Sequence, residues 1–190
     1  MKSALEARLG VRVVMTRDDD KTVPIESRTA LANNNKADLM LSLHANASFR
    51  ATARGATTYV AALKDIGVGG DRVGSERLPV FGGGMRTIDI VPWSFAQIPH
   101  RAKSEELAQT LVAALTDRVP LASNAIEHAP LRVLESANMP AVLLEMGYLT
   151  NADQEMALAG AELQATLTQA IVDAVARFRD GQSTSAQAGR

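Results

Sequence analysis

The sequence predicts an α/β domain with a mostly parallel sheet and helices on both faces. Two stretches carry this prediction. Residues 38–47 begin as a nearly continuous apolar run, and residues 141–145 form a second such run that ends in a glutamate. Runs of this kind are typical of short strands that are buried on both faces of a sheet. Apolar residues at helical spacing lie between and after them, and an alternation of strands with helices is the order of a parallel α/β sheet.

Composition narrows the classes of protein that fit. The chain has 190 residues, of which 46% are hydrophobic and 22% charged, and its net charge is −1. That balance gives no electrostatic case for nucleic acid or an anionic membrane, and no apolar run is long enough for membrane insertion. We expect one domain over residues 1–179 and a disordered polar tail over residues 180–190. Because there is no cysteine, a metal site must use histidines and carboxylates.

The first elements are predicted from local signals. Lys2–Leu9 is predicted to be the last part of a helix, with Gly10 as its C-cap. The β-branched stretch Val11–Thr16 predicts a strand, and residues 17–21 predict a polar loop. Proline suits a first helical turn, so a helix is expected over residues 24–34.

The middle of the chain changes character. Alternating residues predict a strand over Gly55–Leu63. Residues 64–99 contain clustered glycines and prolines and are expected to form one long loop, which could serve as a lid or a binding loop. Trp93 and Phe95 in this loop could stack on a sugar or anchor the loop. Apolar residues at helical spacing then predict a helix from about Pro99 to Asp117.

The last third repeats the alternation. A short strand is expected over Leu131–Leu134, and Ala141–Glu145 is the second buried strand. Asn151, with Gln154 three residues later, has the spacing of a capping box. The helical spacing that follows continues to about Phe178.

Two of the predicted buried strands end in ionisable residues. Ser42, His44 and Asn46 occupy alternate positions, which places them on one side of a strand, and Glu145 ends the other strand. A neutral imidazole that holds Zn²⁺ and a carboxylate that handles the proton of a water molecule together indicate a metal-assisted hydrolase. The alternatives are a core histidine with one hydrogen bond, and a strand end at which Glu145 reaches solvent.

The order of short motifs resembles the zinc-dependent N-acetylmuramoyl-L-alanine amidases, the peptidoglycan amidases of the type used in cell separation. In the first half the matching segments are Val14–Asp18, Glu26–Arg28, Ala32-Asn33, Ala37-Asp38 and Ser42–Ala47. In the second half they are Ser104, Leu107-Ala108, Ala129–Leu134 and Met139–Asn151. The resemblance extends to about residue 178 and is weakest over residues 64–99.

The resemblance implies a reaction and roles for residues. The family cuts the amide between N-acetylmuramic acid and L-alanine in peptidoglycan. His44 matches the last of three zinc ligands, and Glu145 matches the catalytic glutamate that carries the proton. Ser42 and Asn46 are assigned orienting or structural roles beside the histidine. The resemblance also implies a periplasmic or extracellular location, and it leaves a regulatory protein partner unidentified.

One departure from the family pattern bears on activity. The family's first zinc histidine lies in a Gly-His-Gly-Gly turn after the first strand, and its glutamate ligand follows at the start of the first helix; neither is present in this sequence. The helix over Lys2–Leu9 also starts without an N-cap. We therefore expect the first strand of the family fold to be absent and zinc to bind sub-stoichiometrically.

Three readings follow. The chain is an N-terminally incomplete amidase domain, a non-catalytic cell-wall-binding or remnant module of the same fold, or a zinc carboxypeptidase-like enzyme, whose His-x-x-Glu pair is not visible. His100 and His128 could in principle complete a metal site, but surface positions are the simpler interpretation of both.

Overall fold

The structure, a computed structural model, describes residues 1–62, 75–79, 85–89 and 96–188. Its main sheet has four strands in the order β1 (Met40–Asn46), β6 (Ala141–Tyr148), β2 (Ala56–Ala61) and β5 (Leu121–Ala129). The pairs β1–β6 and β2–β5 are parallel, whereas β2 and β6 are antiparallel. The predicted α/β class and the two buried strands are confirmed, with one antiparallel pairing at the centre of the sheet.

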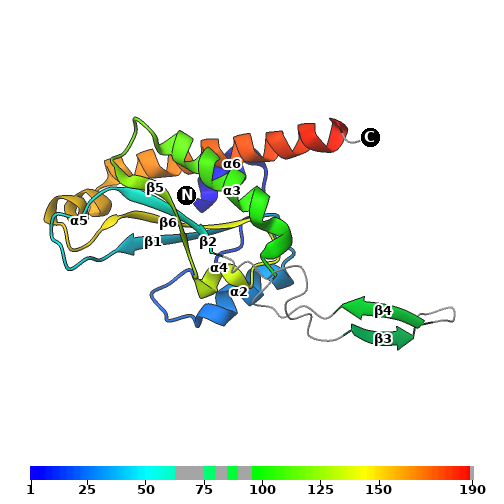
Figure 1. Cartoon of the computed structure of the whole chain (residues 1–190). Helices are drawn as coiled ribbons and strands as arrows, with labels where there is room; N and C mark the ends of the chain where they lie inside the picture. Colours follow the sequence, from blue (N-terminus) through cyan, green and yellow to red (C-terminus); the bar gives the residue numbers. More distant parts are fainter. Residues whose placement is uncertain (63–74, 80–84, 90–95, 189–190) are drawn as a thin grey trace.

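One face of the sheet is covered mainly by two long helices, α3 (Arg101–Leu115) and α6 (Ala161–Ala188), which lie side by side in Figure 1. Two shorter helices, α1 (Lys2–Leu9) and α5 (Ala152–Ala159), pack against α6 on this side. Apolar side chains from α3, α6 and the sheet form the larger core; its most completely buried members include Leu107, Leu111, Leu115, Val142, Leu144 and Ile171.

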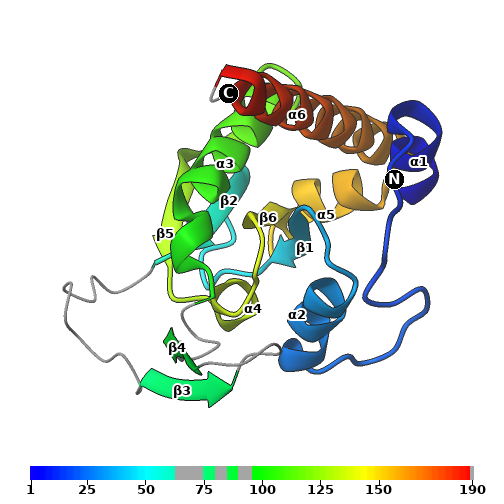
Figure 2. The ribbon, with the colours of Figure 1, turned by 90° about the vertical axis from the view of Figure 1, so that its right-hand side faces the viewer.

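The opposite face is covered by α2 (Ile25–Asn34) and the single-turn helix α4 (Arg132–Glu135), as Figure 2 shows. A smaller apolar cluster lies there and includes Met40, Ala61, Val133, Leu134 and Leu143. The Thr29 hydroxyl, which is buried, donates a 3.0 Å hydrogen bond to the Val133 carbonyl and so joins the two helices. Helices therefore cover both faces, as the sequence predicts.

The alternation in β2 matches this two-sided burial. Thr58 and Val60 point toward the larger core, whereas Tyr59 and Ala61 belong to the smaller cluster. Gly10 ends α1 in the left-handed conformation, with φ of 65°, as expected. These local signals were sufficient because each has one common structural solution.

One prediction in the last third was wrong, and one strand was missed. Leu131–Leu134 is not a strand, because Val133 and Leu134 bury themselves through the turn of α4. A four-residue apolar run suits either structure, and length could not decide between them. Strand β5 was not predicted because it is only partly buried and its polar residues hide the alternation.

The predicted strand Val11–Thr16 was also wrong. The segment forms no ladder with any residue that the structure describes. Val11 and Val13 nevertheless pack against the larger core, so the alternation does mark an inward-facing side. Without an adjacent strand, a β-type sequence has no backbone partner with which to form a sheet.

The loop predicted over residues 64–99 contains regular structure. Strands β3 (Ser75–Pro79) and β4 (Met85–Asp89) pair in antiparallel fashion, and the 3₁₀ turn η2 (Ile98–His100) leads into α3. The hairpin lies apart from the main sheet in both views (Figures 1 and 2). Short strands on either side of a glycine cluster are a hairpin pattern that the long-loop interpretation overlooked. Trp93 and Phe95 lie outside the described residues.

The tail predicted to be disordered from residue 180 is helical to Ala188, where α6 ends. One reason is a side-chain contact with the neighbouring helix, in which the Gln182 amide donates to Glu106 over 3.0 Å. No helix in the described ranges is both long and apolar enough to cross a bilayer.

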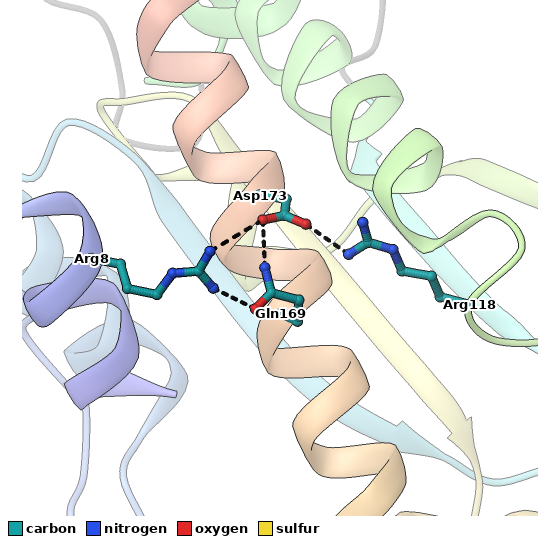
Figure 3. A network of polar contacts seen from close by, with 4 residues as sticks. All are labelled: Arg8, Arg118, Gln169 and Asp173. Atoms are coloured by element: carbon teal, nitrogen blue, oxygen red, sulfur yellow. Dashed lines mark hydrogen bonds and ion pairs between the residues drawn. The ribbon is translucent and has the colours of Figure 1, made fainter.

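A polar network ties the outer helices together (Figure 3). Asp173 of α6 accepts hydrogen bonds from Arg118 at 2.8 Å and from Gln169 at 2.6 Å. Arg8 of α1 donates to Gln169 and lies 3.9 Å from the Asp173 carboxylate. The hydrogen bond from Arg118 is the main cause that lowers the pKa of Asp173. The network thus fastens α1 and the segment after α3 to α6.

We predict that Asp173→Asn lowers the free energy of unfolding by about 0.5–1 kcal/mol at pH 7. A carboxyl with a lowered pKa stabilises the fold above about pH 3.9, its unfolded value, and that contribution is lost as the pH falls through the lowered pKa. Urea unfolding of parent and variant should therefore converge between pH 5 and pH 3. Asp20→Asn, in an exposed loop, is the control, and equal effects of the two changes would contradict the role of the network.

Candidate active site

The strand register places three polar residues in one row across the sheet. His44 of β1 is paired with Glu145 of β6, and Glu145 is paired with Thr57 of β2. Directly paired residues project from the same face of a sheet, so the three side chains are neighbours. Because β2 runs opposite to β6, the row lies where β1 and β6 end and β2 begins. The two residues singled out from the sequence are therefore brought together.

His44 is half-buried and held by its own strand. Its Nε2 atom lies 3.0 Å from the hydroxyl of Ser42, two residues earlier on the same face, and Ser42 is buried. Burial lowers the pKa of His44, and the positive charges of Arg28 and Arg17 lower it further. The imidazole is therefore neutral near pH 7, which is the form that binds a metal ion.

Glu145 is half-buried as well. Its Oε2 atom is buried and has no hydrogen-bond partner among the residues that the structure describes. Burial raises the pKa of Glu145, because the charged form loses hydration. A buried carboxylate oxygen without a partner costs stability, and such groups concentrate at functional sites. Its burial and its unpartnered oxygen make Glu145 a candidate functional residue.

The neighbouring strands supply groups that the sequence interpretation missed. Thr57 is almost completely buried beside Glu145. Tyr59, one row further along β2, hydrogen-bonds to Glu127 of β5; burial first and then Glu127 raise the pKa of Tyr59 to about 12. The phenol therefore keeps its proton and can donate a hydrogen bond. Alternation in β2 was a usable signal for these residues, but β5 itself was not predicted.

A groove of about 240 Å³ runs along the edge of β1 that faces away from β6. Its lining consists of Thr16, Arg17, Arg28 and the β1 residues from Met40 to Ala45. The half-buried His44 and the buried Ser42 are both among these lining residues. Two arginines make the groove positively charged.

The loop that follows β1 is fastened to the turn that follows β6. The Ser48 amide donates to the Thr150 hydroxyl over 3.0 Å, and the Asn151 amide group donates to the Ala51 and Ala53 carbonyls over 3.1 and 3.3 Å. Leu149 N–H adds a bond to the backbone of β1 at its end. These contacts fix the edge of the sheet at which the polar row lies.

The predicted cap at α5 is confirmed in part. The Asn151 side chain accepts a hydrogen bond from Gln154 N–H, as an N-cap should. The Gln154 side chain does not complete the capping box, because its oxygen accepts from the backbone N–H groups of Gly55 and Tyr148. It thereby joins the start of β2 to the end of β6. In the described part of the chain, the Asn46 side chain accepts a hydrogen bond from the neighbouring Ala47 N–H alone, which suits a structural role in this turn.

His100 and His128 do not approach the polar row. His100 contacts Asn138, which precedes β6, and His128 near the end of β5 contacts Glu105. Both histidines lie at the opposite end of the strands from His44. At that end β6 starts and β5 ends. The described ranges contain no group of three or more histidine or acidic side chains able to hold a metal ion.

The fit to zinc is therefore incomplete. His44 is a suitable ligand, but the groove beside it offers arginines and hydroxyls rather than carboxylates. Catalytic zinc normally has three protein ligands, and nearby cations oppose its binding. The donors among the described residues do not make up a complete zinc site.

The sequence of this chain is similar to those of curated N-acetylmuramoyl-L-alanine amidases. N-acetylmuramoyl-L-alanine amidase AmiC of Escherichia coli O6:H1 is 28% identical over 193 residues, which covers 95% of this chain and 45% of AmiC. AmiC of Neisseria meningitidis is 27% identical over 93% of this chain and 44% of its own length. The chain thus spans less than half the length of these curated relatives.

Solved structures of similar fold carry the same description. The N-acetylmuramoyl-L-alanine amidase of Clostridium difficile 630 superposes with a TM-score of 0.70 at 26% identity, over 94% of this chain and 77% of that one. The catalytic domain of CwlV, from Paenibacillus polymyxa, gives a TM-score of 0.69 at 25% identity, over 94% and 78% of the two chains. Since the family profile described as N-acetylmuramoyl-L-alanine amidase also matches residues 1–177, this chain belongs to the N-acetylmuramoyl-L-alanine amidase family.

Proposed function

We propose that this chain is the catalytic part of an N-acetylmuramoyl-L-alanine amidase, which hydrolyses the amide between N-acetylmuramic acid and L-alanine in peptidoglycan. The observation that carries the proposal is the pairing of His44 with Glu145, whose buried oxygen has no partner in the described part of this family member. Because its substrate is peptidoglycan, the proposed enzyme acts in the periplasm or outside the cell. Cell separation is one process in which it would take part.

Glu145 is the proposed catalytic residue. In its ionised form it accepts a proton from the attacking water and returns this proton to the nitrogen of the leaving amine. The raised pKa of Glu145 suits both steps, because it brings the carboxyl closer to the pH at which it must gain and lose a proton. Ser42 holds the imidazole of His44 in place through the contact to Nε2.

His44 is the proposed zinc ligand of this chain. When bound, zinc polarises the scissile carbonyl and lowers the pKa of a water molecule. The described donors do not complete its coordination, so the proposal requires further ligands from outside the described residues. As it stands, the chain is expected to have little activity.

A second candidate function is a non-catalytic module of the same fold that holds the cell wall without metal. The two arginines in the groove favour it, because they disfavour a cation and suit an anionic ligand. This module would be retained on purified cell walls in the presence of a chelator, and no variant of Glu145 would affect its function.

The first prediction for this site concerns catalysis. Glu145→Gln keeps the shape of the side chain and removes its basicity, so amide hydrolysis should fall by at least about 100-fold. The rate of hydrolysis is measured as the release of stem peptide from muropeptides with zinc present. The assay is run on the 190-residue chain and on a form extended by any residues encoded in frame upstream of Met1. Glu135→Gln, in helix α4 between β5 and β6, is the control and should leave the rate of hydrolysis unchanged. An unchanged rate for Glu145→Gln in an active form would refute the assignment.

The same substitution should stabilise the protein at neutral pH. A carboxyl whose pKa is raised in the fold binds protons more tightly there than in the unfolded chain, so its ionisation destabilises the fold as the pH rises above about 4.3. Because Glu145 is only half-buried, we expect a gain below about 1 kcal/mol for Glu145→Gln at pH 7 that disappears near pH 4. Urea midpoints at the two pH values test this, and a loss of stability at pH 7 would contradict it.

Zinc content tests the metal assignment separately. The purified 190-residue chain should hold well under one zinc per chain, measured by elemental analysis after dialysis, because His44 alone binds weakly. His44→Ala should abolish the small amount of zinc that remains bound, whereas His128→Ala should leave that amount unchanged. One tightly bound equivalent in the 190-residue chain would show that other residues complete the site.

A further inference from the structure

The backbone connection between β2 and β6 stops at the position of Glu145. Among the described residues, the antiparallel ladder between these strands runs from the pair Tyr59–Leu143 to the pair Thr57–Glu145 and ends there. Glu145 is therefore the last residue of β6 that the backbone of β2 holds directly. Because the end of a ladder opens more easily than its middle, a group that continues the connection bears on the Glu145 side chain.

A bulge in β6 directly follows Glu145. His44 of β1 pairs with Glu145. Two positions later Asn46 pairs with Tyr148, so one residue of β1 faces two residues of β6. A bulge interrupts the regular hydrogen bonding of a strand and re-aims the side chains beside it, and bulges are frequent next to active sites. The direction of the Glu145 side chain thus depends on how this bulge is held.

The side chain of Gln154, in α5, holds both strands at this point. Its Oε1 atom accepts hydrogen bonds from Gly55 N–H over 3.2 Å and from Tyr148 N–H over 3.1 Å. Gly55 lies two residues before Thr57, and Tyr148 is the first paired residue after the bulge. One side-chain oxygen therefore takes the place of the β2–β6 ladder beyond Glu145.

Gln154 is itself held by hydrogen bonds. Its backbone N–H donates to the side chain of Asn151 over 3.2 Å, and Asn151 donates in turn to the loop before β2. A pocket of about 240 Å³, whose apolar lining includes Met146, Leu158 and Leu163, borders Gln154 on another side. Because the pocket leaves space beside the amide group, the hydrogen bonds decide where its oxygen lies.

We propose that Gln154 is a positioning residue of the amidase, which acts through the bulge of β6 to fix the direction of the Glu145 side chain. This inference rests on the proposed function, in which Glu145 is the catalytic carboxylate. Without the shared oxygen, β2 and β6 would separate beyond Glu145, and the carboxylate would turn away from the atoms between which it carries a proton. A displacement of about 1 Å at a reacting group can cost about 100-fold in rate.

The alternative is that Gln154 serves only to start α5. A glutamine at this position of a capping box normally bonds to the backbone N–H of the N-cap residue. Here the side chain bonds to two strands that flank the candidate active site instead. A role in the helix alone does not account for an acceptor that two strands share.

The test compares Gln154→Met with Gln154→Glu in the 190-residue chain without zinc. Methionine keeps the length of the side chain and removes the carbonyl oxygen, whereas glutamate keeps an oxygen that can accept both bonds. Three-bond coupling constants, measured by NMR, report whether the χ1 angle of Glu145 has one value or an average. We expect one rotamer in the parent chain and in Gln154→Glu, and averaged couplings in Gln154→Met.

Amide hydrogen exchange gives a second readout. In Gln154→Met, the Gly55 and Tyr148 amides should exchange at least about tenfold faster than in the parent chain, whereas amides in the middle of α3 should not change. Gln164→Met is the matched control, because the Gln164 side chain donates to the Leu158 carbonyl at the junction of α5 and α6. It should leave both readouts unchanged.

Kinetics connect the positioning to catalysis in an extended form that has amidase activity. Gln154→Met should lower kcat at least about tenfold with little change in KM, because the carboxylate acts in the chemical step. Gln154→Glu should restore most of the rate. If Glu145→Gln keeps its rate in such a form, the proposed function fails, and the couplings still decide whether Gln154 directs the side chain.

Three results would overturn the proposal. Averaged couplings of Glu145 in the parent chain would show that its direction is not fixed, and this measurement keeps the test valid if Gln154→Met does not fold. Unchanged couplings in a folded Gln154→Met chain would show that Gln154 does not act on Glu145. Faster exchange throughout the sheet, without a local effect at Gly55 and Tyr148, would assign Gln154 to overall stability alone.

Discussion

The site depends on the register between β1 and β6. Pairing places His44 opposite Glu145, and the same register puts Leu143 in the smaller cluster and Leu144 in the larger core. A slip of one residue would exchange those faces and expose apolar side chains, so burial of the strand enforces the pairing of the two polar residues. The chemistry at the strand ends is thus positioned by the apolar residues that precede it.

The antiparallel β2 gives the site its third side. Since it runs against β6, its first residues lie at the edge where β1 and β6 end, which brings Thr57 beside Glu145. Gly55 is needed at this point, because its φ is +99° and a Cβ atom there would lie 2.4 Å from the backbone of Ala122. If β2 ran parallel to β6, its first residues and the loop before them would lie at the opposite end of the strands, away from Glu145.

How far the sequence predicts this arrangement depends on how local each signal is. The apolar runs of β1 and β6 and the stripes of α3 and α6 are long and have one solution, and the polar ends of the two runs identify His44 and Glu145. The segment Leu131–Leu134 was ambiguous because it is short, and Val11–Thr16 failed because a strand needs a neighbour as well as a sequence. Tyr59, Arg17 and Arg28 gain their roles only from tertiary contacts that no periodicity encodes.

The positive charge of the groove opposes a zinc ion beside His44. Two guanidinium charges within reach of the imidazole oppose a divalent cation at the same edge of the sheet. A carboxylate paired with Arg17 and Arg28 would neutralise that field. A complete zinc site at this place therefore requires carboxylate donors that offset the two arginines.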